Sequence, residues 1–148
     1  MPDQAKPEAL RSVNVKMTDA MIASLKKHDT NRSRVTRLVL AAILQEFHDG
    51  NDEAFNEALA AAHRSSAKTQ KMTQRDDVIW CKAIVWVPER MHIEIHNAAR
   101  NYDLRPADFI RGALIGFTGE DPTKDIVVEG HELWLSDVEE EVNKAESR

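Results

Sequence analysis

Several features that would point to a particular chemistry are scarce or missing in the 148-residue sequence. It contains one cysteine, Cys81, so neither an intrachain disulfide nor a thiolate cluster for zinc can form. No apolar run approaches the roughly 20 residues of a membrane-spanning helix, and residues 1–10 lack the apolar core of a signal peptide. We therefore expect a cytoplasmic protein without membrane association, and we interpret Cys81 as a small filler of the core.

Motifs of catalysis are also missing. The sequence has no glycine-rich phosphate loop and no nucleophile elbow, and its carboxylates show no paired arrangement. His92 and His96 are four residues apart on a predicted helix, a spacing that suits a metal, but no third ligand lies near them in the sequence. We expect a protein that is not an enzyme and that holds no metal or other cofactor.

The composition is that of a soluble globular domain with an uneven distribution of charge. Hydrophobic residues make up 42% and charged residues 30% of the chain, and the net charge is -5. Residues 11–37 nevertheless carry seven Lys and Arg against two Asp, a local charge of +5, whereas residues 76–148 carry eight Lys and Arg against sixteen Asp and Glu, a local charge of -8. The first segment could contact phosphates, and the second could face solvent or a protein.

A pattern of strand, helix, turn and helix occurs twice along the chain. Residues 11–17 alternate between polar and apolar side chains, as a half-buried strand does, and residues 78–87 are rich in β-branched and aromatic side chains. Two helices are predicted after each strand, with Thr18 or Asp19 and then Ser33 as N-caps in the first copy. Because a lone strand leaves its backbone groups unpaired, we expect the two strands to pair with each other.

The repeats divide the chain into five segments, of which the two repeats are expected to form one domain. The segments are a disordered arm (1–10), a first repeat (11–49), a connector helix with a linker (50–77), a second repeat (78–119) and an acidic extension (120–148). The connector helix, residues 52–64, has only a thin apolar stripe. In the extension, a short strand is predicted at residues 126–128 and a helix at residues 132–145.

These motifs resemble those of the ribbon-helix-helix family of DNA-binding proteins. The first copy carries the resemblance through VNVKMTD and RSRVTRLVLAAIL, and the second through AIVWVPE and PADFIRGAL. The resemblance implies a mainly α-helical fold with a short two-stranded antiparallel ribbon, built as a tandem pseudo-dimer within one chain. It also implies that the ribbon enters the major groove of double-stranded DNA. The tandem members that this chain resembles include accessory proteins of conjugative and T-DNA relaxosomes.

The resemblance implies two groups of DNA contacts. The outward side chains of the strands would contact base edges, and these are Ser12, Asn14, Lys16, Lys82 and Trp86. Asn suits adenine, Lys suits guanine, and an aromatic ring could contact a thymine methyl group. The phosphate contacts would come from the start of the first strand and of the following second helix, and these are Arg11, Arg32, Ser33 and Arg34. Arg37 could instead be structural.

Several alternatives stay open. The large apolar side chains of Ile84 and Trp86 could be covered by another chain, or by Leu133, Trp134 and Leu135 of the extension. The polar and charged side chains could form an ordinary solvated surface. The protein could act as a relaxosome accessory factor with a relaxase or other protein as partner, as a transcriptional repressor, or as an antitoxin or adaptor that uses its acidic C-terminal half. More than one chain could bind the same DNA.

Overall fold

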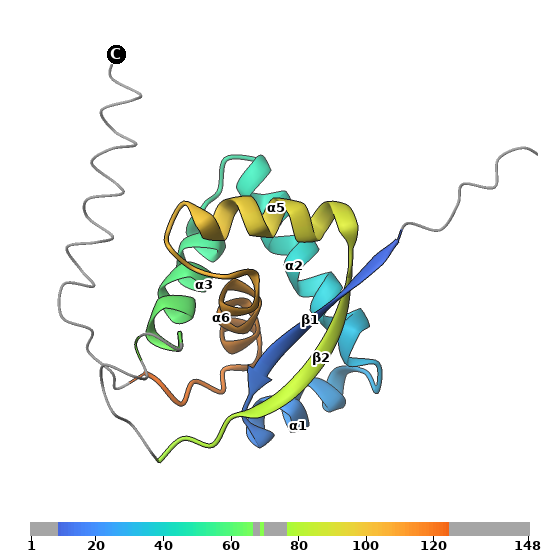
Figure 1. Cartoon of the computed structure of the whole chain (residues 1–148), viewed down its shortest axis with the longest axis vertical. Helices are drawn as coiled ribbons and strands as arrows, with labels where there is room; N and C mark the ends of the chain where they lie inside the picture. Colours follow the sequence, from blue (N-terminus) through green and yellow to red (C-terminus); the bar gives the residue numbers. More distant parts are fainter. Residues whose placement is uncertain (1–8, 67–68, 70–76, 125–148) are drawn as a thin grey trace, which may run out of the picture.

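The computed structural model describes residues 9–66, 69 and 77–124 (Figure 1). In chain order its elements are β1 (Leu10–Met17), α1 (Asp19–His28), α2 (Arg32–His48), α3 (Glu53–Arg64), β2 (Cys81–Pro88), α5 (Glu89–Arg100) and α6 (Pro106–Thr118). The strand predicted at residues 126–128, the helix predicted at residues 132–145 and most of the N-terminal arm lie outside the described residues.

β1 and β2 form a two-stranded antiparallel sheet, which confirms the predicted pairing of the two strands. The register runs from Leu10 opposite Pro88 to Met17 opposite Cys81. The inward side chains are all buried, and they are Val13, Val15, Met17, Ala83, Val85 and Val87. Because a slip of one residue would turn this apolar set outward, burial of one face fixes the register of the ribbon.

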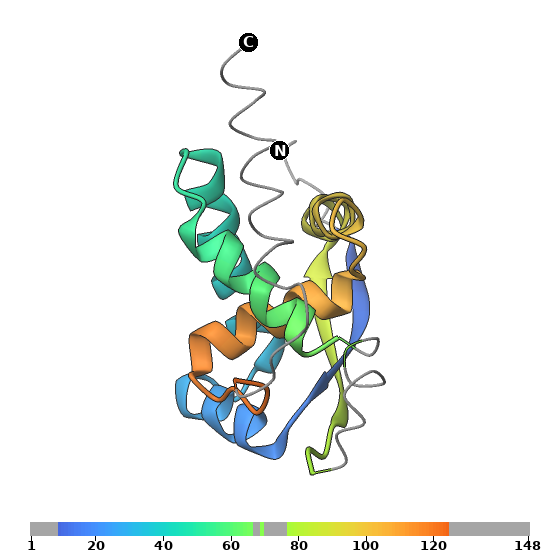
Figure 2. The ribbon, with the colours of Figure 1, turned by 90° about the vertical axis from the view of Figure 1, so that its left-hand side faces the viewer.

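The helices lie on the inward side of this ribbon. Figures 1 and 2 show α2, α3 and α6 on one side of the two strands, with α5 across one end. The core joins the inward strand side chains to Met21 and Leu25 of α1, Leu40 of α2, and Phe109 and Leu114 of α6. The fold is mainly helical with a two-stranded antiparallel sheet, as predicted. Among the described helices, none is both long and apolar enough to span a membrane.

Side-chain caps set the first residues of α1 and α2. The Thr18 hydroxyl accepts a hydrogen bond from the Met21 N–H at 3.2 Å, so Thr18 caps α1 as predicted. The prediction of Ser33 as the cap of α2 is wrong. Asn31 caps that helix through a bond from the Arg34 N–H at 3.1 Å, and Ser33 already lies inside its first turn.

α3 is part of the core, although the sequence predicts only a connector helix. Its buried side chains are Phe55, Ala58, Leu59, Ala61 and Ala62. A Cβ atom at Gly112 of α6 would lie 2.1 Å from the carbonyl oxygen of Ala58 and 2.6 Å from the amide nitrogen of Ala62. The two helices therefore pack nearly backbone to backbone. Small side chains on both helices make this approach possible, so a thin apolar stripe is enough to bury α3.

Two glycines of α6 allow a direct test of the α3–α6 contact. Gly112→Ala inserts a methyl group against the backbone of α3, and we expect overpacking to lower the free energy of unfolding by about 1–3 kcal/mol. Gly116→Ala is the matched control, since nothing lies within 4 Å of its Cβ position, and it should raise the free energy of unfolding by about 0.5–1 kcal/mol. Urea unfolding measures both values, and equal effects would contradict a close contact at Gly112.

Candidate nucleic-acid interface

The outward face of the ribbon carries six side chains in three cross-strand pairs. Ser12 lies opposite Trp86, Asn14 opposite Ile84, and Lys16 opposite Lys82. All six are exposed. Opposing side chains of an antiparallel pair stand about 4.5–5.5 Å apart at Cβ, so these residues form one continuous surface. All five predicted base-contacting residues are therefore on the same face of the ribbon.

The apolar residues Ile84 and Trp86 sit at the centre and towards one end of this face. Ile84 is 48% exposed and Trp86 is 47% exposed. No described part of the chain buries them, and the segment that contains Leu133, Trp134 and Leu135 lies outside the described residues. Within the described structure, these two side chains are available to a ligand.

Side chains from α2 occupy the outer backbone edge of β2. The Ser33 hydroxyl accepts a hydrogen bond from the Trp86 N–H at 2.9 Å. Arg37 donates through Nη1 to the Trp86 carbonyl at 3.0 Å, and Arg32 donates through Nη2 to the Ile84 carbonyl at 3.3 Å. An unpaired strand edge exposes such N–H and C=O groups to water or to other chains. These bonds give partners to the outward backbone groups of Ile84 and Trp86, and they anchor β2 to the start of α2.

This arrangement places the predicted phosphate contacts in two classes. Arg32 and Ser33 use their side chains to hold the ribbon. Arg34 and Arg11 point to the surface, where Arg34 pairs with Asp29 at 3.4 Å and Arg11 pairs with Glu89 at 3.6 Å. The Arg34 side chain is 63% exposed and that of Arg11 is 54% exposed. Exposed ion pairs of this kind are weak, so both cations could exchange their partner for another anion.

Arg105 is a further exposed cation that the sequence analysis missed. It occupies the N-cap position of α6, its side chain is 70% exposed, and its Nε lies 3.6 Å from Asp108. Asn31 occupies the same position in α2. The signal in the sequence was the Arg105-Pro106 step, because proline favours the first turn of a helix and so marks its start.

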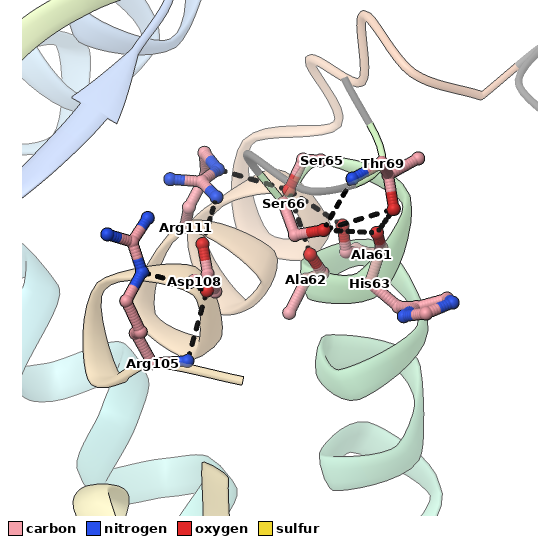
Figure 3. A network of polar contacts seen from close by, with 9 residues as sticks. All are labelled: Ala61, Ala62, His63, Ser65, Ser66, Thr69, Arg105, Asp108 and Arg111. Carbon is pink, nitrogen blue, oxygen red and sulfur yellow. Dashed lines mark hydrogen bonds and ion pairs between the residues drawn. The ribbon is translucent and has the colours of Figure 1, made fainter. Parts of the chain in front are cut away.

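A buried polar network ties α6 to the end of α3 (Figure 3). Arg111 bonds to Asp108 through Nη2 at 2.6 Å and donates through Nε to the Ser65 hydroxyl at 3.1 Å. Its guanidinium also lies over the Trp80 ring, 5.5 Å from the centroid. Burial lowers the pKa of Arg111, while Asp108 acts in the opposite direction. Arg111 is thus held in the interior, whereas Arg37 of α2 donates a hydrogen bond to the outer backbone edge of β2.

Cys81 is not the core filler that the sequence suggests. It is half-buried at the start of β2, and its Sγ donates to Oδ1 of Asp19 at 3.3 Å. This hydrogen bond is the largest cause of a raised pKa for the thiol, and burial adds to it. Cys81 is therefore held as a thiol that links the first residue of β2 to the first turn of α1.

The two histidines of α5 lie side by side, with ring centroids 6.5 Å apart. Partial burial lowers the pKa of His92, and the charges of Arg11 and His96 act in the same direction. The charge of Glu89 acts in the opposite direction but does not outweigh these causes, so the neutral form of His92 is favoured. Within the described residues, no group of three or more His, Cys, Asp or Glu side chains is arranged to hold a metal ion.

Comparisons with protein-family models, with curated proteins and with solved structures find no match for this chain. The resemblance to the ribbon-helix-helix family therefore stays a prediction that rests on motifs in the sequence.

The division of the arginines into two classes can be tested by stability. Arg37→Ala removes a donor to the Trp86 carbonyl, and we expect it to lower the free energy of unfolding by about 1 kcal/mol. Arg34→Ala removes only an exposed ion pair and should change this free energy by less than about 0.5 kcal/mol. Thermal unfolding of both variants checks the difference. Equal losses would contradict the assignment of Arg37 to the ribbon edge.

Proposed function

We propose that this chain binds double-stranded DNA by inserting the β1–β2 ribbon into the major groove. The observation that carries the proposal is the exposed outward face, where Asn14, Lys16 and Lys82 lie within two adjacent cross-strand pairs. A two-stranded ribbon fits the major groove, which is about 12 Å wide in B-DNA. The amide of Asn14 matches the N6 and N7 groups of adenine, and the two ammonium groups match the acceptors of guanine.

The proposal includes a tandem pseudo-dimer within one chain. When the first repeat is aligned with the second, each residue of β1 corresponds to the residue 70 positions later in β2. Met17 then corresponds to Val87, and Asn14 corresponds to Ile84. Asn14 and Ile84 are direct partners in the ribbon. If a two-fold axis relates the two repeats, it must pass midway between two equivalent residues that face each other in the ribbon. The pairing of Asn14 with Ile84 meets this condition and so supports a pseudo-dimer. In both copies the strand is followed by two helices.

Phosphate groups on either side of the groove would meet the first turns of α2 and α6. A helix N-terminus attracts anions because its first N–H groups are unpaired and its dipole is positive there. Arg34 at the start of α2 and Arg105 at the start of α6 add exposed guanidinium groups, and Arg11 adds a third at the end of the ribbon. The side chains of Arg32 and Ser33 hold the ribbon in place for this contact.

The two strands would contribute unequally to base recognition. β1 presents the hydrogen-bonding side chains of Ser12, Asn14 and Lys16, whereas β2 presents Ile84 and Trp86 beside Lys82. The apolar pair suits thymine methyl groups, which lie in the major groove. The preferred site would therefore be asymmetric, and β1 would supply most of the hydrogen-bonded readout.

In the cell, such a protein could serve as a relaxosome accessory factor, with a relaxase or other protein as partner, or as a transcriptional repressor. Both roles agree with a cytoplasmic location, and both allow more than one chain on the same DNA. An antitoxin or adaptor role is the second candidate. The exposure of Ile84 and Trp86 favours it, since large apolar side chains at a surface often mark protein contacts.

The proposal that β1 contacts base edges is tested with a DNA site that the wild-type chain selects from a random duplex library. Against that site, Asn14→Ala/Lys16→Ala should weaken binding by at least about 30-fold, because it removes two base contacts that are worth about 1–3 kcal/mol each. Arg100→Ala is the control, since Arg100 is an exposed cation at the end of α5 farthest from the ribbon. Unchanged affinity and preference in the double variant would remove β1 from the interface. No DNA binding at low salt, together with recovery of a basic protein partner, would favour the second candidate.

The phosphate role of Arg34 makes a different prediction. Arg34→Ala should weaken binding about equally for all DNA sequences and reduce the slope of log affinity against log salt by about 1. Fluorescence anisotropy at four salt concentrations measures the slope. An unchanged slope would show that Arg34 contacts no phosphate.

A further inference from the structure

An apolar groove of about 500 Å³ lies between α2 and α6, and no residue of the ribbon lines it. The wall from α2 includes Val35, Leu38 and Ala42, and the wall from α6 includes Gly116 and Phe117. The last turn of α1 closes one end, and the first half of α3 closes the other. Leu38 is 66% exposed and Phe117 is 42% exposed. A concentration of exposed apolar groups of this kind marks a site for another molecule.

The shape of the groove suits an α-helix. The lining positions of α2 recur at every third or fourth residue from Val35 to Glu46, which spans about 16 Å at 1.5 Å per residue. Ala42 is a small side chain, and nothing lies within 4 Å of the Cβ position of Gly116, so a helix backbone could approach these two positions closely. α3 already packs against α6 in this way, because its backbone lies against Gly112. An amphipathic helix laid in a groove between helices is a common mode of peptide recognition.

The charges at the two ends of the groove differ. Asp29, at the α1 end, accepts a bond from the Asn31 N–H at 2.8 Å and pairs with Arg34, and these contacts lower its pKa. Glu46 and Glu57, at the α3 end, are exposed and form no ion pair within the described part of the chain. The groove therefore carries two uncompensated negative charges beside its apolar surface.

The negative charges of Glu46 and Glu57 determine which molecules could bind in the groove. Residues 125–148 of this chain carry eight Asp and Glu against Lys144 and Arg148, so they would be repelled. Two copies that met groove to groove would bring Glu46 and Glu57 towards their own counterparts if the grooves ran parallel, and towards Asp29 of the other copy if they ran antiparallel. Lys or Arg side chains at the edge of an apolar stripe would be attracted instead.

We propose that this groove binds an amphipathic α-helix of a partner protein, one with large apolar side chains along one face and Lys or Arg beside Glu46 and Glu57. The site is separate from the ribbon and does not depend on DNA binding. A chain with both surfaces could hold a basic protein partner and a DNA duplex at the same time.

The test uses two labelled synthetic helical peptides of roughly 16 residues with the same leucine stripe, flanked by Lys in one and by Glu in the other. The full-length chain should bind the Lys peptide at least about tenfold more tightly than the Glu peptide in fluorescence anisotropy. Gly116→Leu should abolish this binding without unfolding the chain, because nothing lies within 4 Å of its Cβ position. Ala41→Leu is the matched control, since Ala41 is exposed on α2 but does not line the groove.

A charge reversal completes the test. Glu46→Lys/Glu57→Lys should invert the preference towards the Glu peptide. The proposal is overturned if both peptides bind equally well, or if Gly116→Leu binds as the wild type does. It is also overturned if Val138→Asp in the C-terminal segment raises the affinity for the Lys peptide about tenfold, since this chain itself would then fill the groove. A wild-type dimer that Gly116→Leu converts to a monomer would identify a second copy as the occupant and would overturn it as well.

Discussion

The pairing of two short strands that lie some 70 residues apart in the chain is the constraint on which this structure depends. Each strand alone would leave a row of backbone N–H and C=O groups without partners. Pairing satisfies one edge of each strand, and Ser33, Arg32 and Arg37 satisfy the outer edge of β2 at Ile84 and Trp86. With one face buried against the helices, the other face is fixed in register and left exposed. Because this surface is already ordered, it would lose little conformational freedom on binding a rigid duplex.

The sequence predicted the parts of this fold that have a local cause. Alternation of polar and apolar residues identified β1, and a composition rich in β-branched and aromatic residues identified β2. The contribution of α3 was underestimated because the helix buries alanines, and only the position of Gly112 opposite Ala58 makes them a core. The part played by Ser33 was missed because its partner, Trp86, is 53 residues away. Contacts of this range have no local pattern.

The candidate site shows the same division between local and distant causes. The outward residues of the ribbon followed from the period of two, and the register placed all of them on one face. Arg32 and Arg34 looked equivalent in the sequence, yet one bonds to the ribbon edge and the other lies at the surface. The chain therefore has two candidate binding surfaces. One is the outward face of the ribbon, which carries polar and apolar side chains, and the other is the groove between α2 and α6, which has Glu46 and Glu57 at one end. They have no residue in common, so one domain could join a nucleic acid to a protein.

The central claim is that β1 reads base edges while the first turn of α2 contacts phosphate. An NMR titration of the ¹⁵N-labelled chain with the selected DNA duplex tests it most directly, since it reports on every amide at once. The account predicts the largest shifts in the amide signals of Asn14, Lys16 and Lys82 and in that of Arg34, with little change along the groove at Ala42 and Gly116. Shifts confined to the helices, with the ribbon signals unchanged at saturating DNA, would contradict it.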